Sequence, residues 1–268
     1  MKFILVEKTK KDKFLSIFQL LKHSTQTIHF YFNEDRVYIQ GMNSGHSCLF
    51  ELFLEYEWFD YFEKENISLI VDINIFISIL SIASDNQFLM IEFEKEKEDK
   101  LNISYIQNKE IITYLPQYKF QESSHYNKFF EITLMELEED LLSIPELEYD
   151  AEMAICPKIW SEVLSQLALF ADKINIKCNE EMIELKSLGE QGEMKIDIPI
   201  DNIQEYSINE GEEMDMLFNI QLLSKLSLTT KLTNSVNISF KKDFPLQIKY
   251  PFDKNILVFY VAFMVDND

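Results

Sequence analysis

Apolar residues recur at intervals of three and four positions in four stretches of the chain, and this spacing predicts four amphipathic helices. The apolar positions of these stretches are Phe14, Ile17, Phe18 and Leu21; Phe76, Ile79, Leu80 and Ala83; Trp160, Val163, Leu164 and Leu167; and, less regularly, Leu222, Leu223 and Leu226. After each stretch, apolar and polar residues alternate as they do in half-buried strands. The alternating apolar positions are Ile28, Phe30, Phe32, Val37 and Ile39; Leu89, Ile91, Phe93, Leu101, Ile103 and Tyr105; Ile174, Ile176, Cys178, Ile183 and Leu185; and Val236, Ile238, Phe240, Leu246, Ile248 and Tyr250.

The spacing of the helices predicts an internal repeat. The intervals from Phe14 to Phe76 and from Trp160 to Leu222 are both 62 residues, whereas Phe76 and Trp160 are 84 residues apart. Equal intervals indicate two copies of a domain, each built from two helix-plus-strand units, with extra residues between the copies. We therefore expect an N-terminal domain at residues 1–133, a connecting segment at 134–150 and a C-terminal domain at 151–268.

The connections between the predicted strands are short, as at Asn33–Asp35 and Asn179–Glu181. Short connections join antiparallel strands, because parallel neighbours need a longer crossover. The fold class is therefore expected to be α+β, with the helices on one face of antiparallel sheets.

The segment Leu134–Tyr149 reads LMELEEDLLSIPELEY and differs from an ordinary flexible linker. It is acidic, yet it carries many bulky apolar residues, whereas flexible spacers are rich in Gly and Ser. Pro145 removes a backbone donor and favours an extended conformation at Ile144. We interpret the segment as a strap that is ordered against the surface and offers side chains to a partner.

Composition indicates a globular chain of 268 residues with 47% apolar content. The sequence contains no Gly-rich phosphate-binding motif and no G-x-S-x-G, and its many carboxylates favour a solvated acidic surface over a catalytic pair. Its histidines and cysteines lack metal-ligand spacing, which favours reduced thiols in an intracellular protein. These residues are His23, His29, His46 and His125, and Cys48, Cys156 and Cys178. We expect no enzyme activity, cofactor or metal site.

Two apolar runs bear on membranes and export. No small-residue cleavage pattern follows the N-terminal run, so we expect no signal peptide. The run Ile256–Val265 is too short to span a bilayer and is expected to form a buried strand.

The formal net charge of −21 argues against binding to a polyanion, unless the positive charge is concentrated in one place. Lysines do gather around the first and fourth predicted helices. They are Lys8, Lys10, Lys11, Lys13, Lys22, Lys225 and Lys231. Either these are ordinary solvated lysines, or the four helices share a face that is less acidic than the rest of the surface.

Five segments together resemble the proliferating cell nuclear antigen family of DNA sliding clamps. They are the strap at 134–149, IQGMNSGHSCL at 39–49, KINIKCNEEMIELKSLGEQGEMKI at 173–196, FPLQIKY at 244–250 and LVFYVAFMV at 257–265. The resemblance covers nearly the whole chain. It implies a DNA-clamp fold of two similar domains, with helices lining the pore of a trimeric ring and sheets on the outside. Such a ring would place DNA against the helices and the acidic surface outward.

The resemblance also implies a partner-peptide pocket under the strap. Its residues here would be Met42, His46, Leu49, Leu142, Ile144, Pro145, Pro245, Tyr260 and Ala262. Ser47 and Phe263 depart from the family pattern, so partner preference is expected to be unusual. The subunit interface would pair residues 127–134 with 191–198 of a neighbour, and its side chains would be Phe130, Ile132, Met194 and Ile196.

The DNA-facing residues implied by the resemblance are Lys10, Lys11, Lys13, Lys22, Lys225 and Lys231. Other basic positions of the family are occupied by Ser78, Ser81, Glu162, Ser165, Leu169 and Leu228, so we expect weaker DNA contact than in a typical clamp. Glu180 stands at the position of the family's main modified lysine.

The implied function is that of a processivity factor. It would form a homotrimer around duplex DNA and tether DNA polymerase, the clamp loader and other replication and repair proteins. It would act inside the cell, in the nucleus or at a cytoplasmic viral replication site. One alternative is a clamp-fold subunit of a heterotrimeric, checkpoint-like ring or a clamp-fold viral transcription factor. A catalytic function, such as a nuclease, is a third hypothesis.

Overall fold

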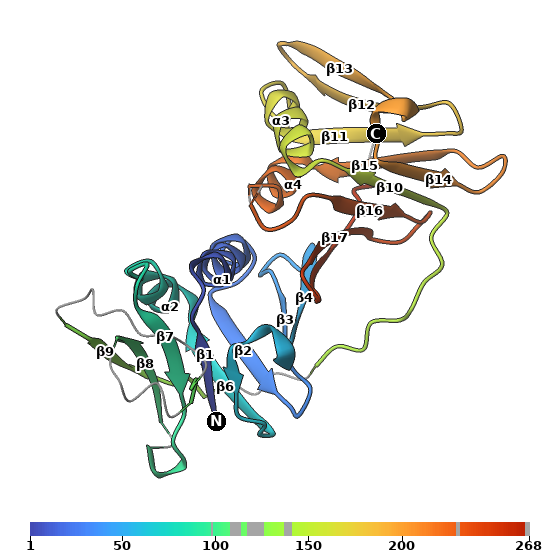
Figure 1. Ribbon diagram of the computed structural model, residues 1–268. Helices are drawn as coiled ribbons and strands as arrows, with labels where there is room; N and C mark the ends of the chain where they lie inside the picture. The colour runs from blue at the N-terminus through green and yellow to red at the C-terminus, as the bar shows by residue number, and fades with distance from the viewer. Residues whose placement is uncertain (98, 108–113, 117–125, 137–140, 229–230, 266–268) are drawn as a thin grey trace. The chain divides into compact units, whose positions relative to one another are not determined.

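The computed structural model describes residues 1–97, 99–107, 114–116, 126–136, 141–228 and 231–265 (Figure 1). The chain divides into two compact units. Unit 1 comprises Met1–Gly41, Glu51–Leu141 and Asp253–Asn255, and unit 2 comprises Met42–Phe50, Leu142–Phe252 and Ile256–Asp268. Two short segments, Met42–Phe50 and Asp253–Asn255, thus group with a different unit from their sequence neighbours. The division expected from the sequence, into residues 1–133 and 151–268, did not include these two segments as exceptions.

Unit 1 contains two helices and two sets of antiparallel strands (Figure 1). Its helices are α1 (Lys8–Leu21) and α2 (Ile73–Leu80). One sheet has the order β5 (Tyr61–Phe62), β1 (Lys2–Leu5), β7 (Phe88–Glu92), β8 (Lys100–Ile106) and β9 (Lys128–Thr133). The other strands follow the order β4 (Cys48–Glu55), β3 (Arg36–Met42), β2 (Thr27–Phe32) and β6 (Ile67–Asp72). Short 3-10 turns lie at Tyr56–Trp58 and Lys95–Lys97.

Unit 2 repeats this plan. Its helices are α3 (Pro157–Leu167) and α4 (Ile220–Leu226). Its first set of strands has the order β14 (Glu205–Ile208), β10 (Ala151–Ile155), β16 (Val236–Phe240), β17 (Leu246–Phe252) and β18 (Asn255–Val261). Its second sheet has the order β13 (Gly192–Pro199), β12 (Met182–Gly189), β11 (Lys173–Cys178) and β15 (Met214–Asn219). A 3-10 turn lies at Ile200–Asn202.

The same turn chemistry closes one hairpin in each unit. Between β2 and β3, the side-chain oxygen of Asn33 accepts hydrogen bonds from the backbone N–H groups of Asp35 and Arg36, at 2.9 and 2.8 Å. Between β11 and β12, the side chain of Asn179 accepts from Glu181 and Met182, at 2.9 and 3.1 Å. An Asn side chain that replaces a backbone acceptor in this way favours a tight turn, so both predicted hairpins form.

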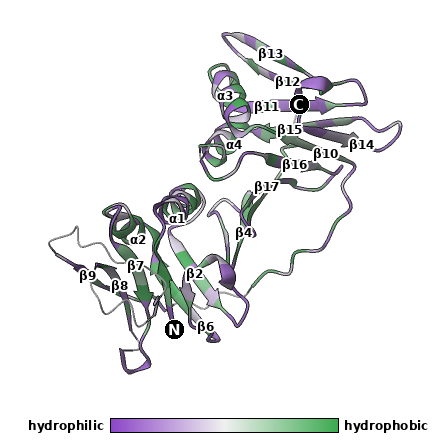
Figure 2. Cartoon of the chain, viewed as in Figure 1, coloured by the Kyte–Doolittle hydropathy of each residue, from purple (hydrophilic) through white to green (hydrophobic). Residues whose placement is uncertain are grey.

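The core of unit 1 is aromatic. The ring centroids of Phe14 and Phe18 in α1 lie 4.8 Å apart, and Phe76 of α2 lies 4.9 Å from Phe18 and 5.6 Å from Phe30 of β2. All four rings are buried, and edge-on contacts of this kind add to the free energy gained by burying their area. The strands beneath these helices are largely hydrophobic (Figure 2). In unit 2, Trp160 of α3 is fully buried and fills the equivalent place.

The helix starts also repeat between the units. The Asp72 carboxylate accepts from the N–H groups of Asn74 and Ile75 at the start of α2. The Asn219 side chain accepts from Leu222 at the start of α4. Such N-caps satisfy backbone donors that the first helical turn leaves unpaired.

The fold class is confirmed as α+β with antiparallel sheets, and all four predicted helices are present. The prediction that Ala83 belongs to the second helix is wrong. Helix α2 ends at Leu80, and the N–H groups of Ile82 and Ala83 bond to carbonyls three residues back, which tightens the chain into a turn. The expected C-terminal buried strand is β18, which ends at Val261. Within the described ranges, no helix is long and apolar enough to cross a membrane.

The strap is tied down in each unit. Residues 137–140 lie outside the described residues. In unit 1, the N–H groups of Leu134 and Met135 donate to the carbonyls of Asp99 and Ile70, each at 2.9 Å. In unit 2, the Lys241 ammonium donates to the Glu148 carbonyl at 2.8 Å. Its residues from Leu141 to Tyr149 form no regular secondary structure.

Candidate functional site

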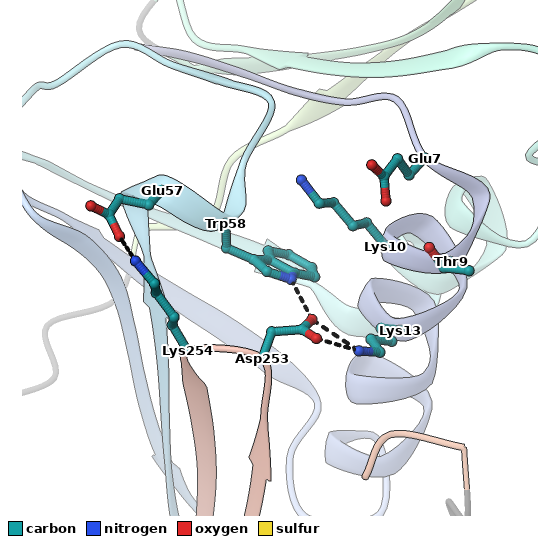
Figure 3. A pocket seen from close by; sticks show the side chains of 8 residues that line it. All are labelled: Glu7, Thr9, Lys10, Lys13, Glu57, Trp58, Asp253 and Lys254. Atoms are coloured by element: carbon teal, nitrogen blue, oxygen red, sulfur yellow. Dashed lines mark hydrogen bonds and ion pairs between the residues drawn. The ribbon is translucent and has the colours of Figure 1, made fainter.

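Lys10 and Lys13 of α1 form ion pairs within unit 1, as Lys8 also does with Asp85, and Figure 3 draws the Lys13–Asp253 pair. Lys13 lies 2.8 and 2.9 Å from the two carboxylate oxygens of Asp253, and the indole N–H of Trp58 donates to the same carboxylate at 3.0 Å. Lys10 lies 2.8 Å from the carboxylate of Asp60. Both lysines line a small cavity of 280 Å³, whose wall also carries an ion pair between Lys254 and Glu57.

The Asp253 carboxylate is fixed by geometry and by charge. Its residue has a φ of 51°, in the left-handed region that Asp and Asn tolerate better than most side chains. Burial alone would raise the pKa of Asp253, but hydrogen bonds from Lys13 and Trp58 outweigh it and hold the pKa below its usual value. The carboxylate therefore stays ionised and keeps Lys13 engaged at neutral pH.

Lys11 requires a correction to the predicted DNA-facing set. Its side chain is buried, and its ammonium donates to the carbonyl oxygens of Ser84, Asp85 and Gln87. Three acceptors satisfy the three donors of an ammonium, so the charge secures the turn after α2 from inside the unit. Desolvation by the surrounding protein lowers the pKa of Lys11. This buried ammonium has no access to a ligand on the helix surface.

Lys22, Lys225 and Lys231 are exposed, and no ion pair within the described ranges engages them. Lys22 caps the end of α1, and Lys225 lies in the last turn of α4. The helix dipole favours a cation at a helix C-terminus. Such a lysine can still contact an additional anion.

The helix positions that lack lysine offer little else to an anion. The hydroxyls of Ser78, Ser81 and Ser165 donate to carbonyls of their own helices, at 2.7, 2.7 and 2.8 Å. Leu169 and Leu228 are strongly exposed apolar residues. The side chain of Glu180 accepts a hydrogen bond from the Gly211 N–H at 3.0 Å, so it supports a loop rather than projecting freely.

All nine predicted pocket residues fall within the segments of unit 2. They are Met42, His46, Leu49, Leu142, Ile144, Pro145, Pro245, Tyr260 and Ala262. His46 has a φ of 53°, in a turn that the Asn43 side chain organises by accepting from the N–H groups of Ser47 and Cys48. The Ala262 N–H donates to the Ser47 carbonyl at 2.9 Å, which joins two of the predicted segments.

The outer positions of these segments are partly open. Leu49 alternates with the buried Cys48 and Phe50, and Tyr260 alternates with the buried Phe259 and Val261. In a strand, alternate residues face opposite sides, so Leu49 and Tyr260 lie on the face away from the core. On the strap, the side chain of Leu142 is 48% exposed.

The predicted subunit edges are strands at the ends of their sheets. In the described topology β9 pairs with β8 and β13 pairs with β12, and each strand ends the sheet order. Ile132 is buried within unit 1 and Phe130 is half-buried, with its ring 6.5 Å from that of Tyr105. The outward apolar side chain of β9 is instead Phe129, which is 69% exposed.

A groove that was not anticipated from the sequence runs beside β9. It has a volume of 750 Å³ and lies between Phe129–Thr133 and the exposed face of α2. Its apolar lining includes Ile75 and Ile82, both of which are exposed. On β13, Met194 and Ile196 are half-buried and share one face of the strand.

The paired helices, antiparallel sheets and repeated halves define the class as a protein with the sliding-clamp fold. Residues 8–125 match the family model of the proliferating cell nuclear antigen N-terminal domain, and residues 143–264 match that of its C-terminal domain. The chain therefore belongs to the proliferating cell nuclear antigen family.

Individual relatives agree with this assignment. The chain is 22% identical over 260 residues to proliferating cell nuclear antigen of Chaetomium thermophilum, covering 92% of this chain and 93% of that protein. It is 22% identical over 253 residues to a DNA polymerase sliding clamp of Methanococcus maripaludis, covering 93% and 94%. A crystal structure of the proliferating cell nuclear antigen of Entamoeba histolytica matches the fold with a TM-score of 0.83, at 19% identity and 98% coverage of both chains.

Proposed function

We propose that this chain is the subunit of a homotrimeric ring that encircles duplex DNA and acts as a processivity factor. The ring would tether DNA polymerase, its clamp loader and other replication and repair proteins through peptides that enter the pocket under the strap. It would catalyse no reaction itself. It would act in the nucleus or at a cytoplasmic viral replication site.

The observation that carries the proposal is that the two predicted interface strands both lie at sheet edges. Strand β9 ends a sheet of unit 1 and β13 ends a sheet of unit 2, so within the described residues each has one side without a neighbouring strand. Contacts between two different surfaces build a closed ring when the rotation between subunits allows closure. Edges of this kind would be an aggregation hazard if they stayed uncovered. The apolar groove beside β9 would bury side chains from the neighbouring chain.

The sparse positive charge also fits enclosure. Among the predicted DNA-facing lysines, Lys22, Lys225 and Lys231 are exposed and unengaged within the described residues, whereas Lys10 and Lys13 are paired. A protein that depends on phosphate contacts loses affinity steeply with salt. A closed ring is held by topology and needs only weak contacts, which permits sliding.

Retention on circular DNA tests enclosure directly. After loading, the protein is expected to remain on a nicked circle through a high-salt wash and to be lost when a restriction enzyme linearises that circle. Equal loss from both forms would rule out encirclement. The mass of the pure protein in solution is expected to be three times that of one chain.

A matched variant separates assembly from folding. Phe129→Asp places a charge on the exposed side of β9, so it should convert the trimer to monomers while leaving the melting temperature of each unit nearly unchanged. Tyr126→Asp is the control for this variant. It places the same charge at an exposed position just before β9, so it should leave the trimer intact.

A second candidate is a clamp-fold subunit of a mixed ring. The observation that favours it is the engagement of the α1 lysines in Lys10–Asp60 and Lys13–Asp253 pairs, since one subunit of a mixed ring can lack basic helices. A pure protein that stays monomeric at high concentration would support this candidate and exclude the homotrimer.

A further inference from the structure

A second groove lies in unit 1, along one edge of strand β6. β6 pairs with β2 on its other side, with Ile67 opposite Phe32 and Ile70 opposite His29. The groove has a volume of 1010 Å³. It is lined by β6, by residues of the β7–β8 connection and by the first residues of the strap, and it shares none of the predicted pocket residues.

The backbone of β6 offers open hydrogen-bonding groups to this groove. Ile73, just beyond β6, donates its N–H to Gln26 on the β2 side, and Met135 donates to the Ile70 carbonyl from the groove side. Backbone groups of successive strand residues point to alternate edges, so Ser68 and Ile70 both face the groove. The N–H and carbonyl of Ser68 and the N–H of Ile70 have no backbone partner within the described residues.

The contact with Met135 also shows that another part of the chain already bonds to this edge of β6. It is a single hydrogen bond, of 2.9 Å, from an extended stretch of chain to this edge. A backbone group of the strap therefore already bonds to one carbonyl on this edge of β6. Within the described residues, no backbone group bonds to the neighbouring position of this edge, Ser68.

The side chains around the groove define the chemistry of its occupant. The lining is mixed: Leu69 and Phe93 are buried beneath the groove, and Ile67 and Leu134 are half-buried. The rim is acidic: Asp99 and Glu136 are exposed, and no ion pair within the described ranges neutralises them. Glu65 is also present but is paired with Lys95 and with the N-terminal ammonium of Met1, each at 2.6 Å, and hydrogen bonds from both hold its pKa below the usual value.

We propose that this groove docks an extended peptide segment with alternating apolar and basic residues, which joins β6 as an added strand. Main-chain hydrogen bonds to Ser68 and Ile70 would supply the pairing, and alternate apolar side chains would pack against Ile67 and Leu134. Lysine or arginine side chains would meet Asp99 and Glu136, which gives preference for a cationic segment. The partner is a protein with such a segment, and it binds independently of the pocket under the strap.

The test uses a labelled peptide of alternating lysine and valine, titrated with the full-length protein by fluorescence anisotropy. A peptide with glutamate in place of lysine is the charge control, and one with N-methylated valines is the pairing control. We expect the lysine peptide to bind and both controls to lose at least about tenfold in affinity, the effect of losing one or two hydrogen bonds or charge contacts.

Variants of the protein test the same site from the other side. Ser68→Pro removes an N–H that faces the groove and is tolerated at a sheet edge, so it should weaken binding about tenfold while Ser68→Ala does not. The double change Asp99→Asn and Glu136→Gln should weaken binding and flatten its dependence on salt. Circular dichroism and melting temperature check the fold of each variant.

Several outcomes would overturn the proposal. One is equal binding of the lysine and glutamate peptides; another is unchanged binding of the N-methylated peptide, a readout that needs no variant to fold. If the peptide does not bind and Ser68→Pro instead reduces self-association, the edge serves a second copy of this chain and the proposal is wrong. If the peptide binding survives Ser68→Pro in a folded protein, the site lies elsewhere.

Discussion

The hydroxyl of Tyr250 donates a hydrogen bond to the carbonyl oxygen of Leu226, at 2.8 Å, and so holds the end of α4 against strand β17. Unit 1 contains the same device. Tyr105 of β8 donates to the carbonyls of Ile79 and Leu80, at 3.0 and 3.3 Å, where α2 ends. Both phenols are buried, and burial raises the pKa of each. Each helix therefore ends on a neutral donor, which satisfies carbonyls that the last turn leaves unpaired.

We predict that Tyr250→Phe lowers the free energy of unfolding by about 1–3 kcal/mol. The ring still fills its place, so the loss comes from a buried carbonyl left without its donor. Urea denaturation followed by circular dichroism measures the change. Tyr126→Phe is the matched control, because that ring is exposed and its change should stay within about 0.5 kcal/mol. A Tyr250→Phe protein as stable as the wild type would mean that water or another donor replaces the hydroxyl.

Periodicity was sufficient to predict the helices and hairpins because the burial of alternate residues is local in the chain. It was insufficient where strands are buried without alternation. β1 and β10 have nearly continuous buried runs, with patterns that resemble neither a half-exposed strand nor a helix face. Periodicity also could not predict the order of strands in the sheets, or that Met42–Phe50 and Asp253–Asn255 group with a different unit from their sequence neighbours. Both depend on contacts between residues far apart in sequence.

The candidate site likewise contains some features that the sequence pattern could predict and others that depend on long-range contacts. Lys11 precedes Phe14 by three residues and Phe18 by seven, which places it on the apolar face of α1, so the helical pattern already held the signal that it is buried. No such signal exists for the Lys13 pair, because Asp253 lies 240 residues away and reaches Lys13 only through the fold. The groove beside β9 likewise needs the packed positions of α2 and the strand.

Lys11 and Lys22 are predicted to have opposite phenotypes. Lys11→Met leaves the Ser84, Asp85 and Gln87 carbonyls without their donor, so unfolding should become easier by about 1–3 kcal/mol while retention on nicked circular DNA is unchanged. Lys22→Ala removes an exposed charge, so stability should hold while salt-dependent binding to DNA weakens. The slope of log affinity against log salt should fall by about 0.9 for each phosphate that the variant no longer neutralises. Weakened DNA binding in a fully stable Lys11→Met protein would contradict the assignment.

The Lys13–Asp253 pair is predicted to give a stability that depends on pH. The pKa of Asp253 is lowered in the folded protein, so its contribution is fully present above the unfolded pKa, which is about 3.9. It is lost as the pH falls through the lower folded pKa. Because the carboxylate is partly exposed, Asp253→Asn should cost only about 0.5–1 kcal/mol at pH 7. Asn also tolerates the φ of 51°, so backbone strain does not enter the comparison.

Melting curves of the wild type and Asp253→Asn measure this effect. The two melting temperatures should differ at pH 7 and converge as the pH falls below about 4. Protonation then removes the charge of Asp253, so the wild-type side chain becomes neutral like the Asn of the variant. A difference that stays constant down to pH 3 would show that the variant acts through packing against Trp58 rather than through charge.

The last prediction concerns the proposed peptide pocket under the strap. Tyr260 lies on the outer face of β18 and Leu142 is half exposed on the strap, so both side chains reach the surface where the apolar plug of a partner is predicted to bind. Replacing either by Ala should weaken binding of a plug peptide with apolar and aromatic residues by about 2 kcal/mol, or roughly thirtyfold, as expected for an anchor residue of an interface. Isothermal titration with the full-length protein measures the affinity, and solution mass verifies that each variant assembles as the unaltered protein does.

Leu141→Ala is the matched control for the strap variant. Leu141 adjoins Leu142 and is equally exposed, at 48%, but it is not among the predicted pocket residues. If Leu141→Ala weakens the peptide as much as Leu142→Ala, the strap contributes general apolar contact and no defined pocket. If neither Tyr260→Ala nor Leu142→Ala affects binding, the peptide docks elsewhere. The edge of β6 would then be the next surface to probe, because its open backbone groups do not depend on any of these three side chains.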